Sequence, residues 1–247
     1  MRAFSKTDMG VMRRTNQDFI FCSLEQVGNL PNLFIVADGM GGHKAGDLAS
    51  RYTVEEFLKV VKESDNTNPI SVIEEAVRVA NAKLIEKAKE SIDYEGMGTT
   101  LVVATFINNS LYIANVGDSR LYLINNDILQ VTRDHSLVEE MINIGELDRK
   151  NARTHEKKNI ITRAVGVDSE VVADFFEIEY SKGDMILMCS DGLSNMIEDE
   201  EIKNIVNDGN DIDKIGERLV DTANNYGGKD NISVILIDPE YEEVKKC

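Results

Sequence analysis

Five aspartates in this sequence adjoin short apolar, strand-like runs and have Gly, Asn or Ser as neighbours: Asp18, Asp38, Asp118, Asp191 and Asp230. Most of them have no lysine beside them, so their carboxylates would repel one another if folding gathered them without cations. Ligand sets made only of oxygen suit Mg²⁺ or Mn²⁺. The repeated pattern therefore predicts a divalent metal site, although any single Asp-Gly at a strand end also fits an ordinary turn.

Asp38 lies in the most informative stretch of the chain. The four apolar residues before it, 34–37, are too few for a helix and rich in strand formers, so a buried strand is predicted to end at Asp38. The glycines at 39, 41 and 42 allow a tight turn in which main-chain carbonyls can face the same cation as the carboxylate. A helix is predicted to begin near His43.

The composition limits the possible classes of protein. The 247 residues contain no Pro/Ser-rich linker, which predicts a single domain over residues 1–240 and a short tail at 241–247. A net charge of −17 disfavours binding to nucleic acid or to an anionic membrane surface. Three cysteines without Cys-x-x-Cys spacing indicate neither a disulfide framework nor a zinc site. No signal-peptide core or long apolar run is present, so a cytoplasmic monomer is expected.

Periodicity predicts the elements that must position these aspartates. Long amphipathic helices are expected at 44–62 and 71–91, and others at 137–144, 199–207 and 211–226. Four β-like runs between residues 99 and 132, joined by Asn-rich turns, predict an antiparallel meander. Residues 136–158 are read as a surface flap at the edge of a cleft. Further strands are expected at 2–8, 19–24, 33–37, 171–180, 185–189 and 232–237.

Hairpins rather than βαβ crossovers indicate an α+β fold with mainly antiparallel sheets covered by helices. At this point the motifs become informative together, because they occur in one order along nearly the whole chain: Arg13-x-x-Asn16-Gln17-Asp18, Asp38-Gly-Met-Gly-Gly-His43, Gly117-Asp-Ser-Arg120, Ser190-Asp-Gly192 and Asp230-Asn-Ile-Ser233. In these motifs the chain resembles the PPM/PP2C family of metal-dependent protein serine/threonine phosphatases, and most closely its compact bacterial members. The resemblance implies a β-sandwich flanked by helices in α-β-β-α layers, with metal ions at one end between the sheets.

The resemblance also implies a ligand set. Asp38 would bridge two divalent cations, Mg²⁺ or Mn²⁺, with the Gly39 carbonyl holding one of them, and Asp18, Asp191 and Asp230 would complete the set directly or through water. Two cations about 3.5–4 Å apart can share a water, lower its pKa and direct the hydroxide at phosphorus, so no covalent phospho-enzyme is needed. Asp118 would join Asp191 around a third, weaker metal. The alternative for Asp118, equally open, is an ion pair with Arg120 or a turn cap.

Two further residues receive catalytic roles by resemblance. Arg13 matches the arginine that binds phosphate, since a planar guanidinium fits two phosphoryl oxygens; its neighbour Arg14 is expected to face solvent. His43 is the candidate to protonate the leaving seryl or threonyl oxygen. Many family members place a histidine directly after the Asp-Gly, whereas here residues 40–42 intervene, so the alternative is that His43 caps or orients the following helix.

The leading hypothesis is hydrolysis of phosphoserine and phosphothreonine in proteins, with the phosphorylated substrates of a Ser/Thr kinase as partners. A two-metal phosphodiesterase or nuclease uses similar carboxylates, but the charge of −17 and the lack of a basic groove argue against it. A non-catalytic metal-binding scaffold that recognises phosphoproteins is the third reading. Such a protein would be expected to have lost Arg13 or one of the metal-binding aspartates, and all of them are present.

Overall fold

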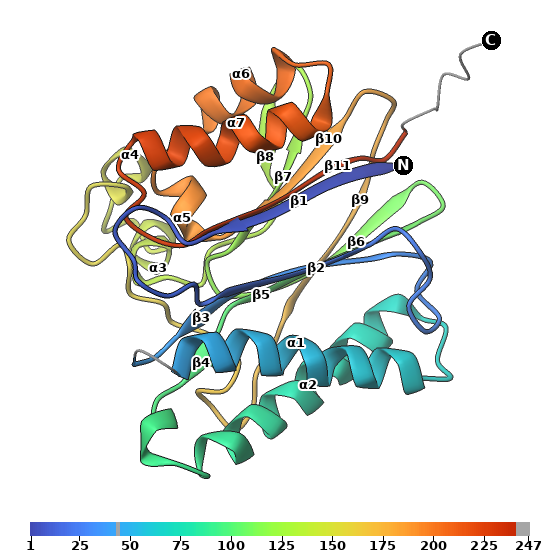
Figure 1. The fold of residues 1–247 in the computed structure, drawn as a ribbon, viewed down its shortest axis with the longest axis vertical. Coiled ribbons are helices and arrows are strands. Elements are labelled where there is room, and N and C mark those ends of the chain that lie inside the picture. The colour runs from blue at the N-terminus through green and yellow to red at the C-terminus, as the bar shows by residue number, and fades with distance from the viewer. Residues whose placement is uncertain (43–44, 241–247) are drawn as a thin grey trace.

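Two antiparallel sheets pack face to face and are covered on their outer faces by helices, which gives four layers (Figure 1). The structure is a computed structural model that describes residues 1–42 and 45–240. The fold expected from the sequence, an α+β sandwich flanked by helices, is confirmed. Among the described helices, none combines the length and the apolar character needed to cross a bilayer.

The larger sheet contains most of the long buried strands. Its order is β2 (Asp18–Ser23), β3 (Leu33–Met40), β5 (Leu101–Ile107), β6 (Ser110–Val116) and β9 (Asp174–Glu179), and β4 (Gly98–Thr99) pairs with the end of β3. Every pairing is antiparallel. Residues 33–37 of β3 are all buried, as expected for a strand that is covered on both faces.

The second sheet joins the two ends of the chain. Its order is β1 (Arg2–Asp8), β11 (Ile232–Asp238), β10 (Met185–Cys189), β7 (Arg120–Ile124) and β8 (Ile128–Gln130). The register of β1 against β11 runs from Arg2 opposite Asp238 to Asp8 opposite Ile232. The loop after β1 and the loop before β11 therefore emerge at the same edge of the molecule.

Helices α1 (Ala45–Glu63) and α2 (Pro69–Ala88) cover the larger sheet, and the 3₁₀ turn η1 (Ile92–Tyr94) follows them. Pro69 opens α2, and Asn68 caps it by accepting a hydrogen bond from Ser71 N (3.0 Å). On the opposite face lie α5 (Asp191–Ser194), α6 (Asp199–Asn207) and α7 (Ile212–Asn225). Asp211, in the acidic run before α7, caps that helix by accepting a hydrogen bond from Asp213 N.

The apolar core has one layer between the sheets and one under each pair of helices. Phe34 of β3 lies between the sheets and meets Phe106 of β5 edge-on, with ring centroids 5.8 Å apart. Across from them, Met188 of β10 and Ile235 of β11 contribute to the same cluster. This apolar filling holds the sheets together while leaving the strand ends to carry polar residues.

The predicted four-stranded meander is wrong. The hairpins β5–β6 and β7–β8 both form, but β6 and β7 belong to different sheets. The chain crosses from one sheet to the other at Gly117–Ser119, where Gly117 has a φ of +106°. Turn residues determine which neighbouring runs form a hairpin, but they do not determine which sheet that hairpin joins. The crossover places Asp118 at the end of the sandwich, between the two sheets.

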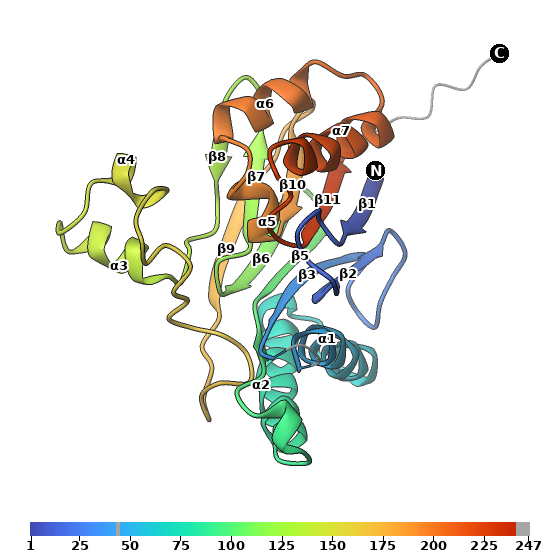
Figure 2. The ribbon, with the colours of Figure 1, turned by 60° about the vertical axis from the view of Figure 1, so that its left-hand side comes forward.

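The flap, residues 136–158, projects from one edge of the sandwich and contains helices α3 (Leu137–Asn143) and α4 (Arg149–Ala152), as Figure 2 shows. The two helices are linked by an ion pair between Arg149 and Glu139 (2.7 Å). Its base is closed by a β-bridge between Ser136 and Ile161 and by a hydrogen bond from Leu137 N to Ile160 O (2.9 Å). The flap is thus a separate lobe on a narrow, hydrogen-bonded stem.

Candidate metal and phosphate site

Strand pairing and sheet crossovers bring the five aspartates to one end of the sandwich. Asp18 and Asp38 are directly opposite each other on β2 and β3. Asp191 begins α5 immediately after β10, and Asp230 stands two residues before β11. Asp118 lies on the turn where the chain changes sheets. The strand end predicted at Asp38 is wrong, because β3 continues to Met40 through its pairing with β4. The other four acids lie at or near strand ends, and the two sheets together are needed to make all five neighbours.

The electrostatics show that these carboxylates act on one another. Burial raises the pKa of Asp38 well above its usual value, and the charges of the other four aspartates raise it further. Burial likewise raises the pKa of Asp18 to about 7, and that of Asp191 to about 6 with a further contribution from Asp230. Burial and the charge of Asp191 raise the pKa of Asp118 to about 8. Without cations, the site holds more negative charge than its surroundings can stabilise.

The donor set fits a divalent cation. Asp18 Oδ1 and Asp191 Oδ1 are buried and have no hydrogen-bond partner among the described residues. Unpartnered buried oxygens are rare because each one leaves a desolvation penalty uncompensated, and a hard cation would compensate both. The described His, Cys, Asp and Glu side chains do not converge in any group of three ready to hold an ion. Water and main-chain oxygen commonly complete the coordination of Mg²⁺, so the aspartates need not all contact an ion directly.

Ser190 and Asn231 organise this site, although their sequence pattern predicts no role for them beyond membership of a motif. The Ser190 hydroxyl donates to Asp18 Oδ2 (2.7 Å) and accepts from Ser233 N (2.9 Å). The Asn231 amide donates to Met9 O (2.8 Å) and Thr15 O (2.9 Å), while its oxygen accepts from Gln17 N (2.9 Å). Asn231, which directly follows Asp230, therefore ties the loop after β1 to the segment that carries Asp230. Such contacts depend on tertiary neighbours and leave no spacing signal.

Gly39 meets a strict steric requirement. A Cβ at this position would lie 2.0 Å from Gly46 O and 2.7 Å from Gln17 O, so only glycine fits. Gly39 N also donates to Gln17 O (3.1 Å), which joins the end of β3 to the residue before Asp18. The backbone segments at Gln17, Gly39 and Gly46 pack closely together, which fixes the main chain next to Asp38.

Arg13 lies at the mouth of the site. Its guanidinium donates to Asp230 Oδ2 (2.5 Å) and to Lys229 O (3.3 Å). Arg14 is exposed and forms no hydrogen bond or ion pair within the part of the chain that the structure describes. The two neighbouring arginines thus differ in that Arg13 contacts an aspartate of the site, and its phosphate-binding role stays a prediction. His43, the other residue with a predicted catalytic role, lies outside the described residues.

Asp118 does not pair with Arg120, which removes the ion pair as an alternative for it, while the turn cap stays open. The Arg120 guanidinium instead forms a two-pronged contact with Asp134, with distances of 3.0 Å from Nε to Oδ1 and 2.7 Å from NH2 to Oδ2. Its remaining nitrogen donates to Tyr122 OH (2.9 Å). The Asp118 carboxylate is consequently left available at the end of the sandwich.

The chain matches the family model described as "Protein phosphatase 2C" over residues 13–236. It belongs to the protein phosphatase 2C family. A serine/threonine phosphatase, stp, from Listeria monocytogenes is 40% identical over 245 residues, which covers 96% of each chain. The protein phosphatase PhpP of Streptococcus pneumoniae is 38% identical and covers 97% of this chain and 98% of its own.

Solved structures of protein phosphatase 2C relatives agree with this assignment. Staphylococcus aureus serine/threonine phosphatase Stp1 superposes with a TM-score of 0.90 at 35% identity, over 97% of this chain and 95% of that one. The catalytic domain of the phosphatase PstP in complex with two manganese ions gives 0.84 at 30% identity, over 96% and 97%. Divalent-metal dependence is thus a property of the family to which this chain belongs.

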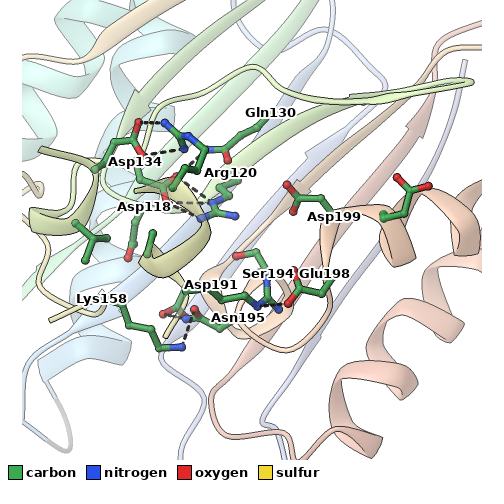
Figure 3. Close-up of a pocket in the computed structure, with 16 residues that line it drawn as sticks. Asp118, Arg120, Gln130, Asp134, Lys158, Asp191, Ser194, Asn195, Glu198 and Asp199 are labelled. Carbon is green, nitrogen blue, oxygen red and sulfur yellow. Dashed lines mark hydrogen bonds and ion pairs between the residues drawn. The ribbon is translucent and has the colours of Figure 1, made fainter. Parts of the chain in front are cut away.

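In this protein phosphatase 2C chain a cleft of about 330 Å³ runs from the aspartates to the flap (Figure 3). Arg153, which directly follows α4 in the flap, pairs with Glu198 across it (2.8 Å), and Lys158 donates to Asn195 Oδ1 (3.4 Å). Cys189, near Asp191 in sequence, does not face the cleft as a nucleophile: it is fully buried, and burial raises the pKa of its thiol. A metal-dependent route agrees with this arrangement better than thiol chemistry does.

Proposed function

We propose that this protein hydrolyses the phosphate esters of phosphoserine and phosphothreonine in other proteins, using divalent cations held at the aspartate site. The observation that carries the proposal is the buried group of mutually repelling carboxylates, two of whose oxygens have no partner among the described residues, next to an arginine. Family membership agrees with this activity.

The ligands in this proposal are aspartates from five separate segments, together with one main-chain carbonyl. Asp38 would touch two cations, the Gly39 carbonyl one of them, and Asp18, Asp191 and Asp230 would complete the set; Asp118 would contribute to a third, weaker position. The chemistry that the ions supply when bound is activation of a water molecule as the nucleophile at phosphorus. The hydroxyl of Ser190 holds Asp18 Oδ2 in place and so leaves Oδ1 directed at the site.

Arg13 would bind the phosphoryl group. Its ion pair with Asp230 uses one terminal nitrogen and holds the guanidinium beside the carboxylates, while the side chain remains about half exposed. The remaining N–H groups can donate to phosphoryl oxygens and compensate the charge that develops on them during attack. His43 is proposed as the residue that protonates the departing seryl or threonyl oxygen.

The substrates would be phosphoproteins, and the matching partner a serine/threonine kinase that acts on the same targets. A monomeric, cytoplasmic enzyme with one catalytic domain over residues 1–240 and a tail at 241–247 is part of the same proposal. The flap at 136–158 would help to select substrates, because the side chains of Arg153 and Lys158 reach over the cleft that leads to the aspartates. A polyanionic substrate is disfavoured by the net charge of −17.

Phosphate release from a phosphoserine peptide in the presence of Mn²⁺ tests the proposal. Asp38→Asn should lower kcat by more than the 10–100-fold that changes in outer-shell partners typically produce, and a chelator should abolish activity. Asp65→Asn, at an exposed position, serves as the matched control and should retain wild-type activity. Full activity of Asp38→Asn, or full activity in chelator, would rule the mechanism out.

The two alternative readings are separated by the same preparation. A phosphodiesterase would cleave DNA or RNA faster than the peptide. A non-catalytic scaffold would bind the phosphopeptide, measured by fluorescence polarisation, without releasing phosphate in any divalent metal.

A further inference from the structure

His135 occupies a junction that the proposed chemistry does not use. It is 7% exposed, and its Nδ1 accepts a hydrogen bond from Gly117 N (3.0 Å). A backbone N–H can only donate, so Nδ1 must be unprotonated and the ring proton must reside on Nε2. Nε2 faces Asp174 Oδ2 (3.2 Å), the first residue of β9, and Arg163 lies against the same nitrogen (3.0 Å) while donating to Asp174 Oδ1. The Gly117 N–H and the Asp174 carboxylate therefore favour the tautomer with its proton on Nε2, and in that tautomer Arg163 donates to Asp174 Oδ1 and Val172 O rather than to the ring.

The main chain of His135 joins the same turn to the stem of the flap. Its N–H donates to Gly117 O (3.0 Å), and its carbonyl accepts from Thr162 N (2.9 Å). The next residue, Ser136, forms the β-bridge with Ile161 that closes the flap. Three hydrogen bonds of one residue thus connect the sheet crossover to the point where the flap begins and ends.

The opposite side of the crossover turn is equally constrained. A Cβ on Gly117 would lie 2.6 Å from Thr100 Cγ2, so the turn packs directly on Thr100. The Thr100 hydroxyl is 2.7 Å from the Ser119 hydroxyl and accepts a hydrogen bond from Asp38 N (2.9 Å). Both neighbours of Asp118 are therefore held in place. Ser119 contacts Thr100, which also binds Asp38 N, and Gly117 donates to His135.

We propose that His135 is a positioning residue for Asp118: by holding Gly117 through Nδ1, it sets the place of the Asp118 carboxylate relative to Asp38 and to the flap stem. The inference rests on the proposed role of Asp118 at the metal site. Burial lowers the pKa of His135, which keeps the ring neutral and its Nδ1 lone pair available near neutral pH. Residues that hold a metal ligand in place typically contribute 10–100-fold to metal affinity or activity.

A pair of substitutions separates positioning from simple filling of space. His135→Asn keeps an acceptor near the position of Nδ1, whereas His135→Gln places its polar atoms near Nε2. We expect His135→Gln to lower kcat and to weaken the lowest-affinity Mn²⁺ site by about 10-fold or more. We expect the corresponding losses in His135→Asn to be at most half as large on a logarithmic scale. Asn68→Gln is the matched control, because Asn68 also accepts a backbone N–H through its side chain (from Ser71 N, 3.0 Å) but caps α2, away from the turn and from the flap.

A double-mutant cycle tests whether His135 acts through Asp118. If it does, His135→Gln combined with Asp118→Asn should lose no more activity than Asp118→Asn alone. Additive losses would overturn the proposal, because they indicate an effect that bypasses Asp118. Equal losses in His135→Asn and His135→Gln would overturn it as well.

Amide hydrogen exchange gives a readout that is independent of turnover. The amide proton of Gly117 should exchange at least about 10-fold faster in His135→Gln than in the wild type, and near the wild-type rate in His135→Asn, because the acceptor is lost only in the former. Unchanged exchange in a folded His135→Gln variant would refute the positioning role. Failure of the proposed phosphatase activity would appear separately, as an inactive wild-type protein with normal protection of Gly117.

Discussion

The aspartates at the end of the sandwich have conflicting requirements in the metal-free protein. Burial favours their neutral forms, so Asp191, Asp18 and Asp118 have pKa values of about 6, 7 and 8. An unfolded aspartate has a pKa near 3.9. A group whose pKa is higher in the folded state stabilises the protein below its unfolded pKa, and that contribution is lost as the pH rises through the folded value. Bound cations would remove the conflict by compensating the ionised forms.

This linkage predicts a pH-dependent benefit from metal. In chelator, the thermal midpoint should fall between pH 5 and pH 8 as these carboxylates are forced to ionise, and the increase produced by Mg²⁺ should grow over the same interval. A change of about 1 kcal/mol shifts the midpoint of a domain of this size by about 2–4 °C, so the effect is measurable by scanning fluorimetry. Asp118→Asn should flatten the fall. A midpoint in chelator that is constant or rises with pH would contradict the interpretation.

The two adjacent arginines give a second prediction for single residues. Arg13→Ala should lower kcat/KM for a phosphopeptide by about 100-fold, the usual scale for loss of one preorganised charge-stabilising donor. Arg14→Ala, which removes an exposed side chain with no polar partner in the described structure, should change it less than about twofold. Comparable losses in both variants, measured on proteins with equal thermal midpoints, would show that the position of Arg13 beside Asp230 has no special importance.

At the scale of elements, the sequence predicts strands and long helices well because hydrophobic period and turn residues are local. The helices expected at 44–62 and 71–91 correspond to α1 and α2, displaced by one to three residues at their ends. The four-residue helix α5 was not predicted, since it is too short to show a period. The change of sheet at Gly117 could not be foreseen, because hydrogen bonds to His135 and packing on Thr100 determine it.

The residues of the candidate site also differ in whether a local pattern predicts them. The identity of the aspartates and of Arg13 could be proposed from motifs, whereas the roles of Ser190 and Asn231 could not. Ser190 meets Asp18 from 172 positions away in the chain, and Asn231 reaches Thr15 from 216. A polar side chain that serves a distant segment has no local pattern that distinguishes it from an ordinary surface residue.

The flap supplies a prediction for elements. Arg153→Gln removes an ion pair across the cleft, to Glu198, while Arg149→Gln removes one inside the flap, to Glu139. Both pairs are partly exposed and should contribute less than about 1 kcal/mol to global stability. Only Arg153→Gln should raise amide exchange along α6 and change KM for a folded phosphoprotein. Arg149→Gln is the matched control, and equal effects of the two would show that the contact across the cleft does not orient the flap.

For the molecule as a whole, the layer between the sheets should dominate stability. Phe34 is fully buried there, so Phe34→Ala should lower the free energy of unfolding by about 3–5 kcal/mol in urea titrations. Ile92→Ala, at a position 80% exposed, should change it by less than about 0.5 kcal/mol. Because this layer lies between the sheets, Phe34→Ala should also weaken Mg²⁺ binding measured by calorimetry. A variant that is destabilised but binds Mg²⁺ with unchanged affinity would show that metal binding does not depend on packing in this core layer.

The pairing of β1 with β11 has a consequence for the nascent polypeptide. A ribosome releases β1 first and β11 last, so Asp230 meets Arg13, and Asn231 meets Thr15, only when translation of the domain is nearly complete. A truncated or stalled product would carry most of the acids and still lack the closing strand. We therefore expect phosphatase activity to appear only after β11 has been translated and has paired with β1.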